Sequence, residues 1–210
     1  MDSTVIFFLG LVIAFIGVIP PGLLNMTAAK ISLKEGSNRG IIFSIGVCVI
    51  VCLQTYLAAI FAKYLSNHPE VIDILKRVAL VIFILITIYF LLLARKQPKP
   101  NVEANVRSKH RRFFQGMLLS SLNIFPIPYQ AYMTLTLASF GWMTFEIYSI
   151  IAYVAGAATG TFVMLYIYIF FFDKIKNEKL TSQKNMNYII GAITGVITIF
   201  TLINIIKEMY

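Results

Sequence analysis

Six long stretches of the sequence carry no charged residue, and they limit the fold more than any other feature of the chain. A helix needs about 20 apolar residues to cross the hydrocarbon core of a bilayer. Most of the runs reach that length, and Lys76 and Arg77 can extend the short third run because long basic side chains reach the membrane interface. The sequence therefore predicts an all-α, polytopic membrane protein with six transmembrane helices. The runs are Ser3–Ala29, Gly40–Ala62, Val78–Ala94, Phe113–Phe145, Ile147–Phe172 and Asn185–Ile206.

The composition supports a membrane protein and argues against a nucleic-acid-binding one. Of the 210 residues, 59% are hydrophobic and 13% are charged, whereas soluble domains carry about 25% charged residues. The net charge of +9 would suit nucleic acid. However, the basic residues lie in short segments between the apolar runs, where the positive-inside bias of membrane proteins places them. We therefore expect contacts with membrane lipids and none with nucleic acid.

The distribution of the basic residues orients the predicted helices. Of the 18 Lys and Arg residues, 14 lie in the loops that follow runs one, three and five. Because basic loops stay in the cytoplasm, both termini are predicted to lie outside the cytoplasmic (inner) membrane. The basic loop 95–112 is predicted to lie inside, against anionic lipid headgroups. The length fits one transmembrane domain, with a first half 1–94, the loop 95–112 and a second half 113–210.

Two of the apolar runs contain prolines that an uninterrupted helix does not tolerate. Pro20-Pro21-Gly22 lies within the first run, and Pro126 and Pro128 lie within the fourth. Proline removes a backbone donor and clashes with the preceding turn, and an unsatisfied backbone group in lipid is costly. We therefore predict that helices one and four are broken. The fourth run is too long for one straight crossing, so we also expect a turn near Ser139–Trp142.

The two broken runs match each other at a spacing of half the chain. Four residues of the first run recur 106 positions later in the fourth run, which indicates an internal repeat. Each half of the chain holds three predicted helices, so the second half starts on the opposite side of the membrane. The halves are therefore predicted to form two inverted three-helix repeats. The matching pairs are Phe7 and Phe113, Phe8 and Phe114, Gly10 and Gly116, and Pro20 and Pro126.

Paired helix breaks in inverted repeats are typical of secondary transporters, in which the substrate binds at the breaks. The start of a half-helix offers N–H groups to a carboxylate, and the end of a half-helix offers carbonyls to an ammonium group. Amides inside the membrane add donors and acceptors. The alternative is that the prolines only kink the helices and the amides bond neighbouring helices. The predicted substrate-binding residues are Pro20, Pro21, Gly22, Asn25, Gln54, Asn123, Pro126, Pro128 and Gln130.

Short motifs near the breaks resemble those of the lysine-exporter (LysE-type) superfamily of amino-acid efflux proteins. They are the Pro21-Gly22 break, Gly36–Gly40 with Gly46, and Phe113–Gly116 followed by Asn123. The resemblance covers nearly the whole chain and implies six helices and ion-coupled, alternating-access export of amino acids or similar small zwitterions. The family's Pro-Gly-Pro and Asn-Pro-Lys read Pro21-Gly22-Leu23 and Asn123-Ile124-Phe125 here, which indicates a divergent branch.

Three alternatives to amino-acid export remain open. One is a transporter of another small solute or ion within the same superfamily. A second is a membrane thiol–disulfide electron carrier, which needs a reactive cysteine at each break, but Cys48 and Cys52 both lie in the second run. A third is an intramembrane enzyme, which needs a catalytic dyad facing a cavity; the runs contain no Ser–His pair, paired carboxylates or metal cluster. We expect no enzyme activity, no cofactor and no metal.

Pairs of glycines four residues apart predict close helix packing in the second half of the chain. They are Gly156 with Gly160 and Gly191 with Gly195. Small residues at this spacing let helix backbones approach closely in membranes. We expect these faces to pack helices five and six within the protein, and the alternative is a contact between subunits of a homo-oligomer.

Overall fold

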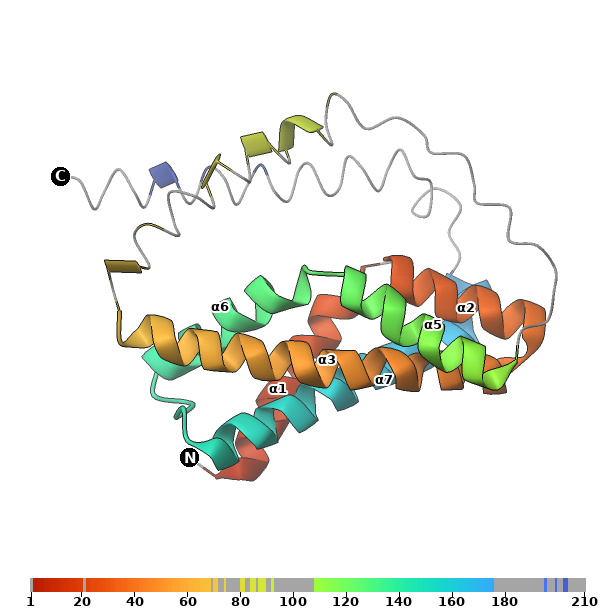
Figure 1. Ribbon diagram of the computed structural model, residues 1–210, viewed down its shortest axis with the longest axis horizontal. Helices are drawn as coiled ribbons and strands as arrows, with labels where there is room; N and C mark the ends of the chain where they lie inside the picture. The colour runs from red at the N-terminus through yellow and green to blue at the C-terminus, as the bar shows by residue number, and fades with distance from the viewer. Residues whose placement is uncertain are drawn as a thin grey trace. The chain divides into compact units, whose positions relative to one another are not determined.

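The described part of the protein is built from helices. The computed structural model describes residues 2–20, 22–68 and 108–175, with single positions between 70 and 92 and between 195 and 203. No strand occurs among these residues, so the all-α prediction holds for them. The helices are α1 (Ser3–Val18), α2 (Leu23–Glu35), α3 (Ser37–Ser66), α5 (Lys109–Leu122), α6 (Pro126–Ser139) and α7 (Ile147–Ile175), shown in Figure 1.

The chain divides into two units, and each unit combines parts of both predicted repeats. The first unit is Met1–Asn67 with Glu103–Ile175, and the second is His68–Val102 with Lys176–Tyr210. Predicted helices one, two, four and five thus belong to the first unit, and predicted helices three and six to the second. In the second unit, a Cβ added at Gly195 would lie 3.6 Å from Thr87 Cγ2. This contact brings together one position from each of predicted helices three and six.

Two helices of the described part are long and apolar enough to cross a membrane. They are α3, with 30 residues, and the Ile147–Phe171 stretch of α7, and the bent pair of α1 and α2 would make a third span. At 1.5 Å per residue, α3 is about 45 Å long, which matches a bilayer including its headgroups. Predicted helices three and six lie mostly outside the described residues, so the number of six spans stays a prediction.

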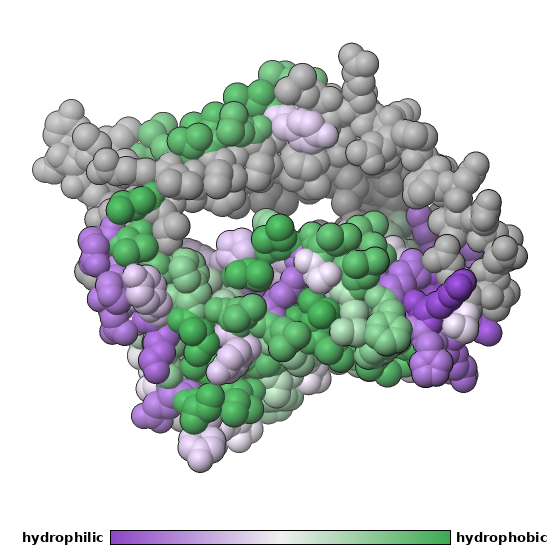
Figure 2. All heavy atoms as spheres, in the orientation of Figure 1, coloured by the Kyte–Doolittle hydropathy of each residue, from purple (hydrophilic) through white to green (hydrophobic). Residues whose placement is uncertain are grey.

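The surface of the first unit has the polarity of a protein that lies in a bilayer. Val5, Phe8, Val12 and Ile16 of α1 recur every three or four residues and are all exposed. Figure 2 shows hydrophobic residues across the middle of the visible face and hydrophilic residues at its two ends. An apolar surface of this extent would be a liability in water, but it is favourable in lipid. The protein is therefore membrane-integral.

Glycines allow two pairs of helices to cross with their backbones in contact. A Cβ at Gly10 of α1 would overlap the Tyr153 carbonyl of α7, and a Cβ at Gly156 would overlap the Phe7 carbonyl. The same reciprocal arrangement joins α5 to α3, through Gly116 with the Phe43 carbonyl and Gly46 with the Phe113 carbonyl. Gly10 and Phe7 are the repeat partners of Gly116 and Phe113, so the repeated residues of the sequence make equivalent crossings.

The predicted small-residue face of helix five packs inside the protein. Gly156 and Gly160 both lie against α1, since a Cβ at Gly160 would overlap the Leu11 carbonyl. Gly191 lies outside the described residues, and the Cβ distance at Gly195 is an ordinary van der Waals contact. This face of helix five therefore packs closely on predicted helix one, and its predicted packing on helix six lies outside the described residues.

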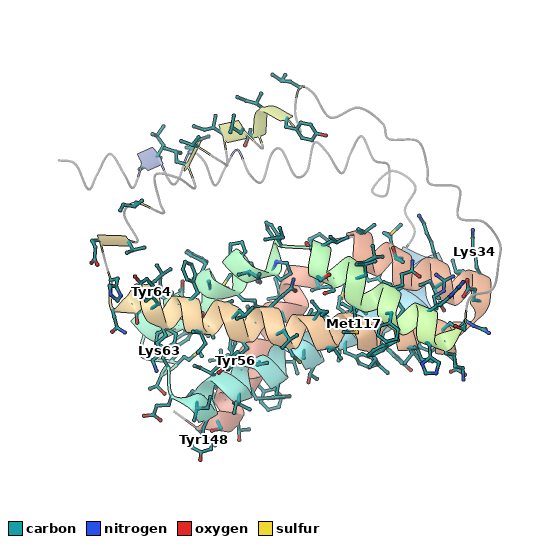
Figure 3. The ribbon with its side chains drawn as sticks, viewed as in Figure 1. Lys34, Tyr56, Lys63, Tyr64, Met117 and Tyr148 are labelled. Atoms are coloured by element: carbon teal, nitrogen blue, oxygen red, sulfur yellow. The ribbon has the colours of Figure 1, made fainter. Side chains whose placement is uncertain are left out.

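A single glycine turns α2 back along α3. Gly36 has a φ of 93°, a region that costs other residues a steric penalty because of their Cβ atom. The turn brings α2 against both α3 and α7. Lys34, just before the turn, and Lys63, near the end of α3, lie at opposite ends of the first unit (Figure 3). The α3 helix thus runs from one polar end of this unit to the other.

The helix α5 begins earlier than the apolar run predicts. Its first turn is Lys109–Arg112, and Ser108 caps it by accepting a hydrogen bond from Arg111 N at 3.4 Å. Serine favours this position because its hydroxyl satisfies a backbone donor that the helix cannot. The predicted loop 95–112 is therefore shorter at this end. The predicted turn near Ser139–Trp142 is confirmed, because α6 ends at Ser139.

Candidate substrate site at two helix breaks

The first break lies between α1 and α2, as the sequence predicts. The α1 helix ends at Val18, α2 begins at Leu23, and the two helix axes meet at 79°. Pro20 and Gly22 belong to the linking segment, in which Gly22 has an extended backbone and is the N-cap of α2. Pro21 lies outside the described residues. A bend of this size removes helical partners from the last carbonyls of α1.

Side chains of the protein satisfy the carbonyls that the first break frees. Asn25 Nδ2 donates to Val18 O at 2.6 Å and to Pro20 O at 3.0 Å. Tyr168 of α7 donates its hydroxyl to the carbonyl between them, Ile19 O, at 2.8 Å. Asn25 is 3% exposed, so its amide is committed inside the protein. Three consecutive carbonyls thus have side-chain donors.

The second break lies between α5 and α6. The α5 helix ends at Leu122, and α6 begins with Pro126 in its first turn. Asn123 has φ −85° and ψ 93°, so the backbone leaves the helix at this residue. Pro126 and Pro128 cost α6 nothing in its first turn, because the N–H groups there have no helical partner. The prediction of a break in helix four is confirmed.

One amide from α3 holds the end of α5 at the second break. Gln54 Nε2 donates to Ser120 O at 3.1 Å and to Asn123 O at 2.9 Å. The side chain of Gln54 is 6% exposed. A helix of the first half therefore satisfies the break of the second half, just as Tyr168 of the second half satisfies the break of the first.

The two breaks adjoin each other through one tyrosine. Tyr129 of α6 donates its hydroxyl to Ile13 O of α1 at 3.0 Å. Its ring lies against Gly17, where a Cβ would come within 2.8 Å of Tyr129 Cε1. Gly17 lies three residues before Pro20, and Tyr129 lies three residues after Pro126. The absence of a side chain at Gly17 therefore lets the start of α6 reach the end of α1.

Gln130 forms a separate polar contact beside the breaks. Its Oε1 accepts a hydrogen bond from the Tyr153 hydroxyl of α7 at 2.6 Å. Gln130 is 4% exposed and Tyr153 is fully buried. This bond anchors α6 to α7, which is the role that an interhelical amide plays in membrane proteins.

The structure brings most of the predicted site residues together in two groups. Pro20, Gly22 and Asn25 form the first group, and Gln54, Asn123, Pro126 and Pro128 form the second. Gln130 follows Tyr129 near the start of α6, and the Tyr153 hydroxyl of α7 holds its side chain. The prediction did not include Tyr153, Tyr168 or Ser120. Their hydroxyls inside apolar runs were the available signal, since buried hydroxyls need partners.

A buried ion pair joins the helix that leaves the first break to the helix that enters the second. Arg112 Nε donates to Glu35 Oε2 at 2.9 Å, and Arg112 Nη2 pairs with Glu35 Oε1. Arg112 Nη1 also donates to Gln115 Oε1. The side chains of Arg112 and Glu35 are 4% and 7% exposed. The prediction of lipid contact is therefore wrong for Arg112, because a bidentate carboxylate compensates its charge inside the protein.

The described side chains that bond the carbonyls of the breaks are neutral amides and hydroxyls. No group of three or more His, Cys, Asp or Glu among the described residues could hold a metal ion. Cys48 and Cys52 are free thiols on α3, and Cys48 Sγ lies 3.6 Å from Ala158 O of α7. The neighbours of the breaks are instead neutral amides, hydroxyls and carbonyls, which can bind a small polar solute without reacting with it.

Apolar helices with two adjoining breaks define a membrane-integral protein with the architecture of a transporter. Residues 15–204 match the LysE type translocator family, and this chain belongs to that family. The family resemblance of the sequence is therefore confirmed. It is a family of transporters rather than enzymes, so the substrate is a small molecule and the surroundings are lipid. No curated protein and no solved structure matches the chain significantly.

Proposed function

We propose that this protein exports amino acids or similar small zwitterions across the cytoplasmic membrane by ion-coupled alternating access. The observation that carries the proposal is the contact of Tyr129 with Ile13 and Gly17, which joins the two helix breaks. Two adjoining breaks place half-helix ends of opposite polarity near each other, and a zwitterion has a charge for each. Neutral amides nearby suit a solute with no net charge.

The helix crossings support two inverted repeats that move against each other. The crossings of Gly10 with Tyr153 and of Gly116 with Phe43 occur at glycines that match in the sequence, and each joins corresponding predicted helices of the two halves. The α5 helix begins beside Glu35, where α2 ends, and Figure 1 shows α1 and α2 leading toward that end. The α1 and α5 helices, which begin the two predicted repeats, thus start at opposite ends of the first unit. Alternating access follows when one repeat rocks against the other around the breaks.

The basic residues support an orientation with both termini outside. Lys34, Arg39 and Arg111 lie near the turn between α2 and α3 or at the start of α5. The positive-inside bias assigns this end of the first unit to the cytoplasm. A homo-oligomer is compatible with the exposed apolar surface, although the glycine faces of the described helices are already used within the chain.

Reconstitution tests the function directly. The full-length protein in liposomes, loaded with a panel of labelled amino acids, should release at least one of them faster than liposomes without protein. Imposed proton and sodium gradients identify the coupling ion by their effect on the initial rate. If no member of the panel moves, amino-acid export is wrong, and the panel should then be replaced by other small solutes.

Labelling from the two sides of the membrane tests the topology. Single cysteines in place of Lys99 and Met209, in a variant that lacks Cys48 and Cys52, should react with an impermeant maleimide from opposite sides. Lys99 should react from the cytoplasmic side because its loop is basic. Labelling of both positions from one side would contradict the six spans and, with them, the inverted repeats.

A further inference from the structure

The second break lies beside buried polar atoms that have no hydrogen-bond partner. Among the described residues, the buried side-chain atoms of this kind are Gln54 Oε1, Thr55 Oγ1 and Ser120 Oγ. Gln54 is 6% exposed, and Thr55 and Ser120 are 0% exposed. Gln54 Nε2 lies 3.1 Å from Ser120 O, so Gln54 Oε1 and Ser120 Oγ belong to one contact between α3 and the last turn of α5. Thr55 follows Gln54 in α3, and consecutive residues of a helix do not face the same neighbour.

Such atoms are expensive unless something binds them. Leaving a buried donor or acceptor unsatisfied costs the full desolvation of that group, and native proteins rarely keep one without a reason. Gln54 and Ser120 each keep such an atom at the same contact, whereas the neighbouring Ser121 hydroxyl bonds within its own helix. The position of the two atoms thus indicates a ligand.

The hydrogen bonds of Gln54 fix the polarity of this ligand. Both partners of its amide, Ser120 O and Asn123 O, are carbonyls that can only accept. The NH₂ group must therefore face them, and Oε1 must face away as a pure acceptor. Oε1 has to be met by a donor or a cation.

The surroundings of Gln54 favour a positive charge over a neutral donor. The end of α5 carries the negative pole of its helix dipole, and this end lies at Ser120 and Asn123. The sequences of α3 and α5 contain no Asp or Glu, so any cation here is held by neutral oxygens. Carbonyls at the end of a half-helix bind alkali ions in transporters with broken helices.

The described residues of the first break offer no comparable unpartnered oxygen to a cation. Val18 O and Pro20 O accept from Asn25, and Ile19 O accepts from Tyr168. None of the unpartnered buried atoms of the described residues lies there. The two breaks of the repeat therefore differ in what they can bind.

We propose that Gln54 Oε1 and Ser120 Oγ form a site for a small monovalent cation at the second break. The cation is either an alkali ion that drives transport or the ammonium group of the substrate, since neutral oxygens at a helix end suit both. This inference rests on the proposed function and specifies which break receives the positive charge. The first break does not receive the positive charge in this scheme.

Cation-dependent unfolding tests the site. The purified full-length protein is heated in N-methylglucamine chloride while either sodium chloride or ethylammonium chloride is titrated in. Stabilisation by sodium identifies an alkali-ion site, and stabilisation by ethylammonium alone identifies a site for the substrate's amino group. In the variant Ser120→Ala, we expect the apparent Kd for that cation to rise about tenfold or more, because a charge-binding oxygen is lost.

The matched control is Ser121→Ala. It also removes one hydroxyl from the last turn of α5, but this hydroxyl already donates to a carbonyl of its own helix. The control should keep the apparent Kd of the unmodified protein. Each variant removes one hydroxyl, so both should fold. The site is wrong if no cation stabilises the unmodified protein, as expected if the two atoms meet only water, or if the control loses the cation as well.

The failure of this site and the failure of amino-acid export are distinguishable. Binding is measured by unfolding, without transport, so a cation can bind to a protein that moves no amino acid. Conversely, amino-acid release from liposomes that is independent of sodium, by a protein that no cation stabilises, would keep the function and remove the site.

Discussion

The two helix breaks occupy matching places in the two halves of the sequence, yet the protein completes them differently. At the first break, Asn25 and Tyr168 together supply donors to three consecutive carbonyls. At the second break, Gln54 alone supplies donors to two carbonyls, and Gln54 Oε1 and Ser120 Oγ stay without partners. One break is satisfied by the protein itself, whereas the other retains acceptors for a ligand.

This difference shows which properties of a repeat resist divergence. The glycine crossings are the same in both halves because a side chain at Gly10 or Gly116 would overlap a backbone carbonyl. No comparable steric limit acts on the polar groups around the breaks. A break needs donors for its carbonyls, but an amide or a phenol from any adjacent helix can supply them. A symmetric scaffold can therefore carry an asymmetric site.

The largest effect is expected where the helices of the two breaks are tied together. Arg112→Gln removes the bidentate partner of the buried Glu35 carboxylate. Loss of one partner of a buried pair costs about 3–5 kcal/mol, so the unfolding temperature in detergent should fall steeply. The unfolding temperature of Arg112→Lys should lie between those of the unmodified protein and Arg112→Gln, because an ammonium group keeps the charge but cannot form the bidentate contact. An unchanged unfolding temperature in Arg112→Gln would show that the helices of the two breaks do not depend on this pair.

The next largest effect is expected on transport when either break is converted to continuous helix. Pro20→Ala with Pro21→Ala, and Pro126→Ala with Pro128→Ala, restore backbone donors and helix propensity. Insertion should stay normal, while the initial rate of amino-acid release per molecule should fall about hundredfold, because several bonds to charged groups are lost.

The two double variants also separate the breaks. If the first break does not receive the positive charge, Pro20→Ala with Pro21→Ala should weaken transport without changing the apparent affinity for the cation. Pro126→Ala with Pro128→Ala should lose both transport and the affinity for the cation. Normal transport per molecule in both variants would contradict a site at the breaks, and lower abundance with proportional transport would favour kinks that serve packing alone.

Substitution of the glycines at the helix crossings tests whether the α1–α7 and α3–α5 crossings are alike. Gly116→Ala and Gly156→Ala each place a methyl group where a backbone carbonyl lies, and overpacking of this kind costs about 1–3 kcal/mol. Because the two crossings are equivalent, both variants should lower the unfolding temperature by similar amounts. The control is Gly195→Ala, where the added Cβ would lie 3.6 Å from its nearest neighbour. A large loss in one variant only would contradict the equivalence of the crossings.

Removal of the amides that donate to the carbonyls of the breaks tests the difference between the two breaks. Asn25→Ala and Gln54→Ala each leave two carbonyls without their donor, so each should destabilise the protein by about 1–3 kcal/mol. Only Gln54→Ala also removes an acceptor of the proposed cation site. Stabilisation by the cation should therefore persist in Asn25→Ala and disappear in Gln54→Ala. The opposite result would assign the positive charge to the first break.

The positions of the breaks could be predicted from the sequence because the effect of proline is local. Pro20 and Pro126 interrupt a helix through their own backbone geometry, whichever helices surround them. The apolar runs gave the helical class because lipid tolerates no other open structure. These inferences needed no knowledge of which helices touch.

The partners of the breaks could not be predicted, because they come from distant parts of the chain. Gln54 lies 69 residues from Asn123, and Arg112 lies 77 residues from Glu35. Sequence periodicity identifies a polar residue inside a run, but not the neighbour that its side chain meets. Arg112 was therefore assigned to a basic loop at the lipid surface. Only the packing of α5 against α2 and α3 shows that it is buried.

The smallest effect is expected for the cysteines, and it tests whether either break carries redox chemistry. A thiol–disulfide carrier needs a reactive cysteine at a break, but Cys48 and Cys52 lie on α3, and Cys48 contacts Ala158 O of α7 at 3.6 Å. The contact is a weak S–H bond, so Cys48→Ala with Cys52→Ala should cost about 1 kcal/mol or less. Amino-acid release should be unchanged, and a membrane-permeant thiol reagent should not inhibit it. If the double variant loses transport while its unfolding temperature is preserved, a cysteine takes part in the function, and the two breaks would have to be compared as parts of an electron path instead of a solute path.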